Sequence, residues 1–240
     1  MISTILSGLR GCTFNDKHNN DIGVVMHSKS IQPPPKKKVK DSVPFMNGSY
    51  DFSTVGSNGE QAFSEREITI VFGLPATTKE QLQVLYSTTL EWLEDVGKQQ
   101  LKFDDIVDYY YMAEVEESSS FEQVMEFGKL TVKFVADPFK MSVDYVGSDV
   151  WDTFNFEEDY VQNNEFDING SETILLYNPR RPVNPIINCT STMTISKDDK
   201  IYNLSIGDNK IYGFKLNSLS NSIFVNGTGK IKFLFRKESI

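Results

Sequence analysis

The chain has 240 residues and a formal net charge of −9, from 24 basic and 33 acidic side chains. This length allows one large domain or two of ordinary size, and the acidic excess argues against sequence-specific or general binding of nucleic acid, because like charges repel. No apolar stretch approaches the roughly 20 residues that span a bilayer, so we expect no membrane contact.

The N-terminal segment leads into an extended arm. Met1–Gly11 lack a basic start and a long apolar run, so we expect a short lead-in without a signal peptide. Ile22–Met26 is an apolar stretch that predicts a strand. Three consecutive prolines at 33–35 then fix an extended backbone and remove three donors, which excludes a central strand. The arm continues to Asn47-Gly48, a pair typical of hairpin turns.

This arm has no catalytic layout, and we expect it to hold a neighbouring subunit. The residues that we expect at such an interface are Lys36, Lys37, Lys38, Lys40, Phe45, Gly48, Tyr50 and Phe52. The lysine run also matches a nuclear localisation signal, a short pattern with many false matches. Lysines that protect a solvated strand edge are a second explanation, and contact with an acidic neighbour is a third.

One amphipathic helix is predicted in the first half of the chain. Glu65–Phe72 alternates charged and apolar residues, as a half-buried strand does, and Gly73-Leu74-Pro75 is expected to end it. Thr77 with Glu80 forms a capping-box pattern that predicts a helix over 78–96, ending at Gly97. Its apolar face, expected to be core, is formed by Leu82, Leu85, Tyr86, Thr89, Leu93 and Val96.

The remaining elements are predicted to be strands. In the first half we expect them at Gln100–Phe103, Tyr109–Glu116, Phe121–Phe127 and Lys129–Ala136, with a Ser-rich turn before Phe121 and a domain boundary at Asp137-Pro138. In the second half we expect Lys140–Val146, Glu165–Ile168, Ser171–Tyr177, Val183–Asn188, Thr190–Ser196, Lys200–Ile206, Lys210–Leu216, Ser222–Val225 and Lys230–Phe235. Turns are expected at Asn169-Gly170, Asp198-Asp199, Gly207-Asp208 and Asn226-Gly227. Many short strands favour an antiparallel sandwich. The acidic and aromatic stretch Asp149–Tyr160 fits neither pattern.

Catalytic and metal patterns are weak in this sequence. His18 and His27 lack partners at metal-site spacing, and Cys12 and Cys189 lack a neighbour that activates a thiolate. We therefore expect no enzyme, no cofactor and no metal, with both cysteines as buried apolar residues. Two acidic runs were considered for a glycosidase pair. They are Asp104, Asp105 and Asp108, and Glu157, Glu158 and Asp159, and both are expected to be solvated.

The order of several blocks between Gly11 and Pro138 resembles the distal tail proteins of long-tailed phages that infect Gram-positive bacteria. The blocks are Phe14-Asn15, Gly23-Val24-Val25-Met26, Gly48-Ser49-Tyr50-Asp51-Phe52, Glu65-Arg66-Glu67, the helix to Trp92-Leu93, Leu101-Lys102-Phe103-Asp104-Asp105 and Tyr109-Tyr110-Tyr111. None is a strict motif, and their order and spacing carry the resemblance.

The resemblance implies a mainly β fold with an α+β N-terminal domain. It implies a ring-forming β-sandwich with one helix and a long hairpin over residues 1–138, and a smaller galectin-like β-sandwich over 139–240. It further implies a hexameric ring in the virion, assembled in the host cytoplasm. That ring joins the tail tube protein to the tail-associated tip or lysin protein, with the receptor-binding protein and the tape measure protein as further partners.

Two other classes of protein stay open at this point. One is a carbohydrate-binding or cell-wall-hydrolysing tail module, which binding to purified wall polysaccharide by the isolated protein would support. The other is the equivalent hub of a phage-tail-like bacteriocin, which neighbouring capsid genes would exclude.

Overall fold

The computed structural model describes residues 11–42, 44–45, 47–55, 59–147 and 162–240. The chain forms two compact units, one that ends at Lys140 and one that covers Met141–Ser239. Each unit has its own apolar core. The expected lead-in at 1–10 and the stretch 149–160 lie outside the described residues.

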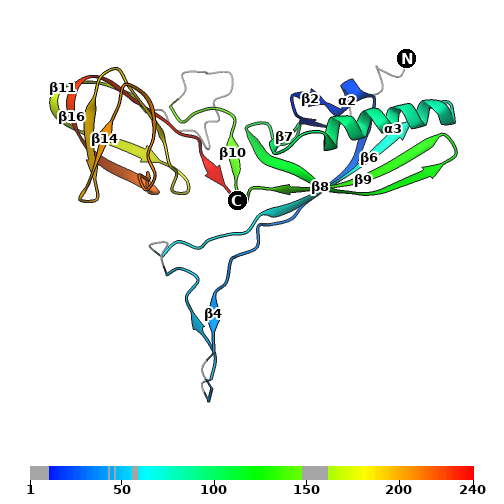
Figure 1. The fold of residues 1–240 in the computed structure, drawn as a ribbon, viewed down its shortest axis with the longest axis horizontal. Coiled ribbons are helices and arrows are strands. Elements are labelled where there is room, and N and C mark those ends of the chain that lie inside the picture. Colours follow the sequence, from blue (N-terminus) through cyan, green and yellow to red (C-terminus); the bar gives the residue numbers. More distant parts are fainter. Residues whose placement is uncertain (1–10, 43, 46, 56–58, 148–161) are drawn as a thin grey trace. The chain divides into compact units, whose positions relative to one another are not determined.

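The first unit is built on one antiparallel sheet with the strand order β2-β1-β7-β8-β9-β6-β3 (Figure 1). Its strands are β1 (Cys12–Phe14), β2 (Lys17–His18), β3 (Val25–Ile31), β6 (Arg66–Pro75), β7 (Gln99–Phe103), β8 (Tyr109–Val124) and β9 (Phe127–Ala136). Strands that are consecutive in the chain are neighbours in β7-β8-β9, which is the predicted meander.

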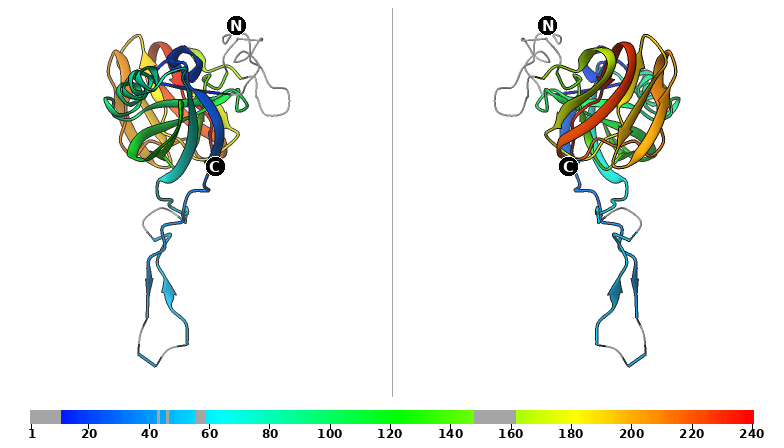
Figure 2. Two further views of the ribbon diagram at one scale, coloured as in Figure 1. Left: turned by 90° about the vertical axis from the view of Figure 1, so that its right-hand side faces the viewer. Right: turned by 90° about the vertical axis from the view of Figure 1, so that its left-hand side faces the viewer.

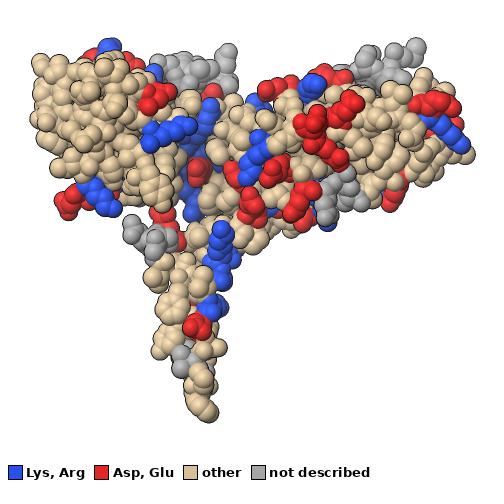
Figure 3. Space-filling model, in the orientation of Figure 1, with Lys and Arg blue, Asp and Glu red and all other residues tan. Residues whose placement is uncertain are grey.

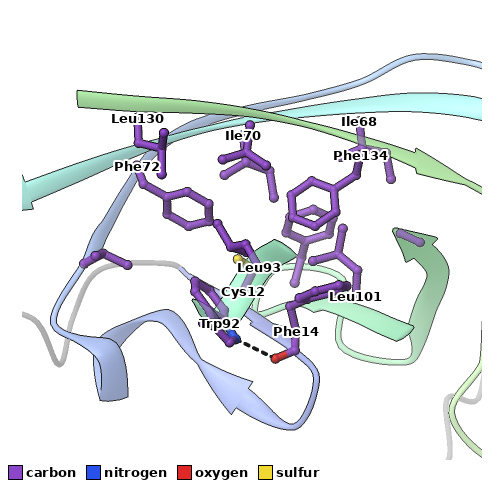
Figure 4. Packing of buried hydrophobic residues seen from close by; sticks show 14 of the residues in the cluster. Cys12, Phe14, Ile68, Ile70, Phe72, Trp92, Leu93, Leu101, Leu130 and Phe134 are labelled. Carbon is purple, nitrogen blue, oxygen red and sulfur yellow. Dashed lines mark hydrogen bonds between the residues drawn. The ribbon is translucent and has the colours of Figure 1, made fainter. Parts of the chain in front are cut away.

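The core of this unit lies between two parts of the sheet and the helix (Figure 4). Ile68, Ile70 and Phe72 alternate along β6 and are fully buried, which confirms the predicted period-two strand. Phe14 on β1 meets Phe134 on β9, with ring centroids 5.2 Å apart in an edge-to-face arrangement. Strands β7 and β8 lie between β1 and β9 in the sheet. The contact between Phe14 and Phe134 therefore shows that the sheet curves around a shared core.

Helix α3 (Lys79–Glu94) covers this core. Its buried residues are Leu82, Thr89, Trp92 and Leu93, and Leu85, Tyr86 and Val96 pack on the core while half-buried. The predicted apolar face is thus confirmed, with Trp92 as a member that the prediction left out. The N-cap is Thr78 and not Thr77, because the Thr78 hydroxyl accepts from the Gln81 amide at 3.2 Å.

Three predictions for the first unit were wrong in detail. The predicted strand Ile22–Met26 is divided, because α2 (Asn19–Ile22) and Gly23 in a left-handed conformation precede β3. β6 continues through Pro75, which sits at the strand's last position, where a missing donor costs little. The Ser-rich segment is no turn, since β8 runs on to Val124 with register shifts at Val115/Glu117 and Ser118/Ser120.

The second unit is an antiparallel sheet with the order β14-β13-β16-β12-β15, and β11 also pairs with β16. The strands are β11 (Glu165–Asn178), β12 (Ile186–Cys189), β13 (Met193–Lys197), β14 (Lys200–Leu204), β15 (Gly207–Lys210) and β16 (Leu219–Leu234). Two short strands, β10 (Lys140–Ser142) and β17 (Glu238–Ser239), pair with each other. The predicted mainly β fold class, without a helix among the described residues of this unit, is confirmed.

Two turns predicted in this unit are wrong, because they lie inside its longest pair of strands. Asn169-Gly170 and Asn226-Gly227 were expected to end strands, but β11 and β16 run through both, and Gly170 lies opposite Gly227. Gly170 and Gly227 have φ values of 91° and 152°, so the glycines bend the paired strands without interrupting them. The inward residues on both sides of the bend, such as Ile223 and Phe233, can then enter one core. Figure 2 shows the curvature of these strands.

Other strand limits in the second unit also differ from the predictions. The turn at Asp198-Asp199 is confirmed, with φ values of 52° and 60°, as in a tight hairpin. Gly207-Asp208 belongs to β15, which ends at Lys210, so the strand predicted over Lys210–Leu216 is wrong. The strand predicted over Lys140–Val146 ends at Ser142.

Candidate assembly interface

The predicted arm is a long two-stranded hairpin, here called the arm, between Ile31 at the end of β3 and Arg66 at the start of β6 (Figures 1 and 2). Near its root the Lys37 amide donates to the Ala62 carbonyl at 2.9 Å, and the Ser64 amide donates to Pro35 at 2.8 Å. Further out, β4 (Lys40–Asp41) pairs with β5 (Tyr50–Asp51). The two limbs therefore form one ribbon, which lies outside the main sheet of its unit.

The two faces of the outer part of the arm differ in polarity. The register places Lys40 opposite Asp51 and Asp41 opposite Tyr50, and the Phe52 amide donates to the Val39 carbonyl at 2.8 Å. Since alternate residues of a strand share a face and directly opposed residues lie on the same face, Val39, Tyr50 and Phe52 share one face with Asp41. Lys38, Lys40 and Asp51 share the other.

A polar network holds the two limbs together. The Lys38 ammonium lies 3.1 Å from one carboxylate oxygen of Asp51, and the Ser53 amide donates to the other at 2.9 Å. The Ser53 hydroxyl accepts from the Val39 amide at 2.9 Å. Hydrogen bonds from the side chain and the amide of Ser53, and then from Lys38, hold the pKa of Asp51 well below its usual range. Asp51 is therefore ionised at neutral pH.

Several apolar side chains of the outer part of the arm are exposed. Val39, Tyr50 and Phe52 are 59%, 55% and 45% exposed, and Phe45 near the tip is completely exposed. Figure 3 shows that the outer part of the arm is mostly uncharged, with the basic residues nearer the root. A ribbon of two strands is marginally stable in water by itself. Exposed apolar groups on such a ribbon are typical of a surface that binds another protein.

All eight residues predicted at an interface lie on this one hairpin. Lys36 forms an isolated backbone bridge with Phe63 at the root, and the side chains of the four predicted lysines are exposed. Gly48 has a φ of 93° in the predicted turn. The structure separates Tyr50 and Phe52 from Lys38 and Lys40 by face. Val39, Val55 and the Asp51–Ser53 network were not predicted, because the cross-strand register is needed to find them.

Some of the residues considered for catalysis form contacts within the fold. Asp104 accepts from the Gly11 amide at 2.7 Å, and His18 Nε2 lies 3.3 Å from the same oxygen. Asp105 forms an ion pair with Lys29. Both cysteines are buried, as predicted. Among the described residues, no three His, Cys, Asp or Glu side chains are grouped to bind a metal. Glu157, Glu158 and Asp159 lie outside the described residues.

The chain is mainly β, with two units and a protruding hairpin that is partly apolar. No family model and no curated protein matches the sequence. Among solved structures, the distal tail protein Dit (gp 19.1) of phage SPP1 aligns over 97% of this chain and 100% of its own, with a TM-score of 0.66 and 12% identity. That protein is described as a paradigm of the hub adsorption apparatus in phages that infect Gram-positive bacteria.

Two baseplate structures of phage P2 in the activated conformation also align. The structure with Ca covers 96% of this chain and 99% of its own, with 9% identity and a TM-score of 0.47. The structure with Sr covers 97% and 99%, with 11% identity and a TM-score of 0.40. The chain has the distal tail protein fold, as the similarity to the SPP1 protein shows, so the resemblance in the sequence is confirmed at the level of fold. No helix in the described part of the chain is long and apolar enough to cross a membrane.

Proposed function

We propose that this protein is a structural component of a phage tail tip, a distal tail protein that forms a hexameric ring. The observation that carries this proposal is the alignment of both units, over 97% of the chain, with the SPP1 hub protein. The ring joins the tail tube to the tip or lysin protein and presents receptor-binding proteins. It works by holding subunits in place, without making or breaking bonds, and it belongs to the virion.

The arm supplies a physical means of ring formation. A ring interface is heterologous, so one surface of each subunit contacts a different surface of the next, and rotation closes the assembly. The exposed apolar side chains of Val39, Phe45 and Tyr50 on the arm favour burial against a neighbour. Burial of apolar surface contributes about 25 cal/mol per Å² removed from water. Burial of these three side chains against a neighbouring subunit would therefore stabilise the interface.

The mass of the purified protein tests this proposal. Light scattering and electron microscopy of the full chain should give a ring of hexameric mass. A monomer at high concentration and low salt contradicts the ring. A monomer that also binds purified wall polysaccharide favours the carbohydrate-binding alternative.

A further inference from the structure

The second unit has a sheet face whose outward side chains are all uncharged. The strands β11, β16, β13 and β14 lie side by side in that order, and their inward residues, such as Ile174, Ile195 and Ile223, are buried in the core. The outward positions alternate with these residues. They are the odd-numbered residues of 171–177 and 201–203 and the even-numbered residues of 194–196 and 220–226, and together they are here called the neutral face. Charged residues make up 24% of the chain, so about three would be expected among these twelve positions.

Three exposed apolar side chains are spread over the neutral face. Leu175, Phe224 and Ile201 are 68%, 45% and 75% exposed. Phe224 lies opposite Thr173 on one neighbouring strand and opposite Ser196 on the other. Ile201 lies opposite Ser196 from the far side. Phe224 and Ile201 are therefore two strand spacings apart, roughly 10 Å, with a hydroxyl group between them.

Hydroxyl and amide groups occupy the next row of the neutral face. The Ser171 hydroxyl donates to Oδ1 of Asn226, directly opposite, at 3.0 Å. Thr194 lies opposite Asn226 on the other side, and Asn203 lies opposite Thr194. Side chains of these types can both donate and accept hydrogen bonds. The neutral face therefore combines an exposed aromatic ring with an array of uncharged polar groups.

This composition fits an uncharged sugar polymer better than a protein partner. Protein interfaces gather their apolar residues in a dry core, in which Tyr, Trp and Arg contribute most of the binding energy. On the neutral face, in contrast, hydroxyl groups separate Phe224 from Ile201. A pyranose ring has apolar C–H faces and a rim of hydroxyl groups, so it can stack on Phe224 while its rim bonds to Thr173 and Ser196. Because neither surface is charged, no ion loses its hydration on contact.

We propose that the neutral face binds an uncharged polysaccharide. Phe224 provides the stacking surface, and Thr173, Ser196 and Asn226 provide the hydrogen bonds. This site is a second function of the chain, and a single subunit contains all of it. In the hexameric ring proposed above, six copies of the face would strengthen a weak single contact by avidity.

Native electrophoresis of the full chain through gels that contain a polysaccharide tests the proposal. The probes are four uncharged polymers: a dextran, a galactan, a mannan and a rhamnan. At least one should slow the wild-type protein, equally at low and high salt, because screening acts only on charges. Phe224→Ala should weaken the apparent affinity about fivefold or more, through loss of the stacked ring, and Phe224→Trp should retain binding. Val107→Ala is the matched control and should behave as wild type, since Val107 is a 77% exposed residue of the first unit.

The contrary outcomes are distinct from failure of the ring. If none of the four polymers slows the wild-type protein, the proposal is overturned, whatever the mass of the protein in light scattering. If F224A is slowed as much as wild type, the neutral face is not the binding site. Slowing by anionic teichoic acid alone, abolished at high salt, assigns binding to basic side chains elsewhere and also overturns the proposal.

Discussion

Single residues in this chain show how burial decides chemical behaviour. Cys12 packs in the core of the first unit and Cys189 in that of the second. Burial, and then the nearby Asp104 carboxylate, raises the pKa of Cys12 to about 12. Burial alone raises the pKa of Cys189 to about 11. Because the thiolate is the reactive form, both thiols should be inert near neutral pH.

Thiol titration checks this prediction at pH 8. A coloured disulfide reagent should find no fast-reacting thiol in the native protein and two per chain after denaturation, the number of cysteines in the sequence. A Phe52→Cys variant should show one fast thiol as a positive control, because Phe52 is 45% exposed. Rapid reaction of the native wild-type protein is the contrary result.

The identity of single buried residues could be predicted only where a pattern was long. Ile68, Ile70 and Phe72 were found because alternation over a strand fixes the inward face. Trp92 was missed, although it is buried and its Nε1 donates to the Phe14 carbonyl at 2.8 Å. Its partner is 78 residues away in the chain, and helical spacing alone gives no information about such a contact.

At the scale of elements, helix α3 owes its position to the sheet beneath it. Leu93 is fully buried in the core of the first unit, while Val84 on the same helix is 68% exposed. Summed over the helix, its stability comes from this packed face more than from intrinsic propensity.

Truncation of Leu93 measures that packing. Leu93→Ala should lower the free energy of unfolding by about 2–5 kcal/mol, from lost burial and a residual cavity. Leu85→Ala should cost less, because Leu85 is half-buried. Chemical denaturation gives both values, with Val84→Ala as the near-neutral control. Unchanged stability of L93A means that the helix face is not packed as described.

Elements were easier to predict by type than by length. Alternation and turn residues located most strands, but Ser118 and the pairs at Gly170 and Gly227 were taken for turns inside what are long paired strands. A glycine that provides a positive φ can end a strand or bend it, and only the opposite strand decides which. The faces of the arm were unpredictable for the same reason, since they depend on the pairing of Lys40 with Asp51.

The lysines of the arm give a second prediction at this scale. Lys36, Lys37, Lys38 and Lys40 are exposed, so changing all four to Glu should leave the fold intact, because exposed charges contribute little to it. The change should impair assembly, since a negatively charged arm then repels a neighbouring subunit whose own formal net charge is −9 in the wild type. Circular dichroism checks the fold, and light scattering at low and high salt checks assembly.

A matched variant tests whether assembly requires the positive charge of the four lysines or the lysine side chains themselves. Changing the same four lysines to Arg keeps the charge, so this variant should assemble as wild type. If the glutamate variant forms normal rings and supports normal tails, the lysines only make the strand edge soluble and have no partner.

At the scale of the whole molecule, the chain consists of two units, each with its own apolar core. The first unit contains the arm and a complete core. The second unit is mainly antiparallel β and has its own core of residues such as Ile187, Ile195 and Phe233. The sequence predicted two domains, with the boundary at Asp137-Pro138. The assignment of the ring to residues 1–138 is a prediction about assembly.

Expressing the two units as separate fragments tests which of them forms the ring. Residues 1–140 alone should form rings or oligomers of ring size, because they contain the arm through which the ring is proposed to form. Residues 141–240 alone should be monomeric and folded, because their core is complete without the first unit. Light scattering of both fragments gives the masses, and the 1–140 fragment with Lys36, Lys37, Lys38 and Lys40 changed to Glu is the control that should have a lower mass. If 1–140 stays monomeric where the full chain forms rings, the second unit takes part in ring closure, and the arm alone is insufficient to hold the ring.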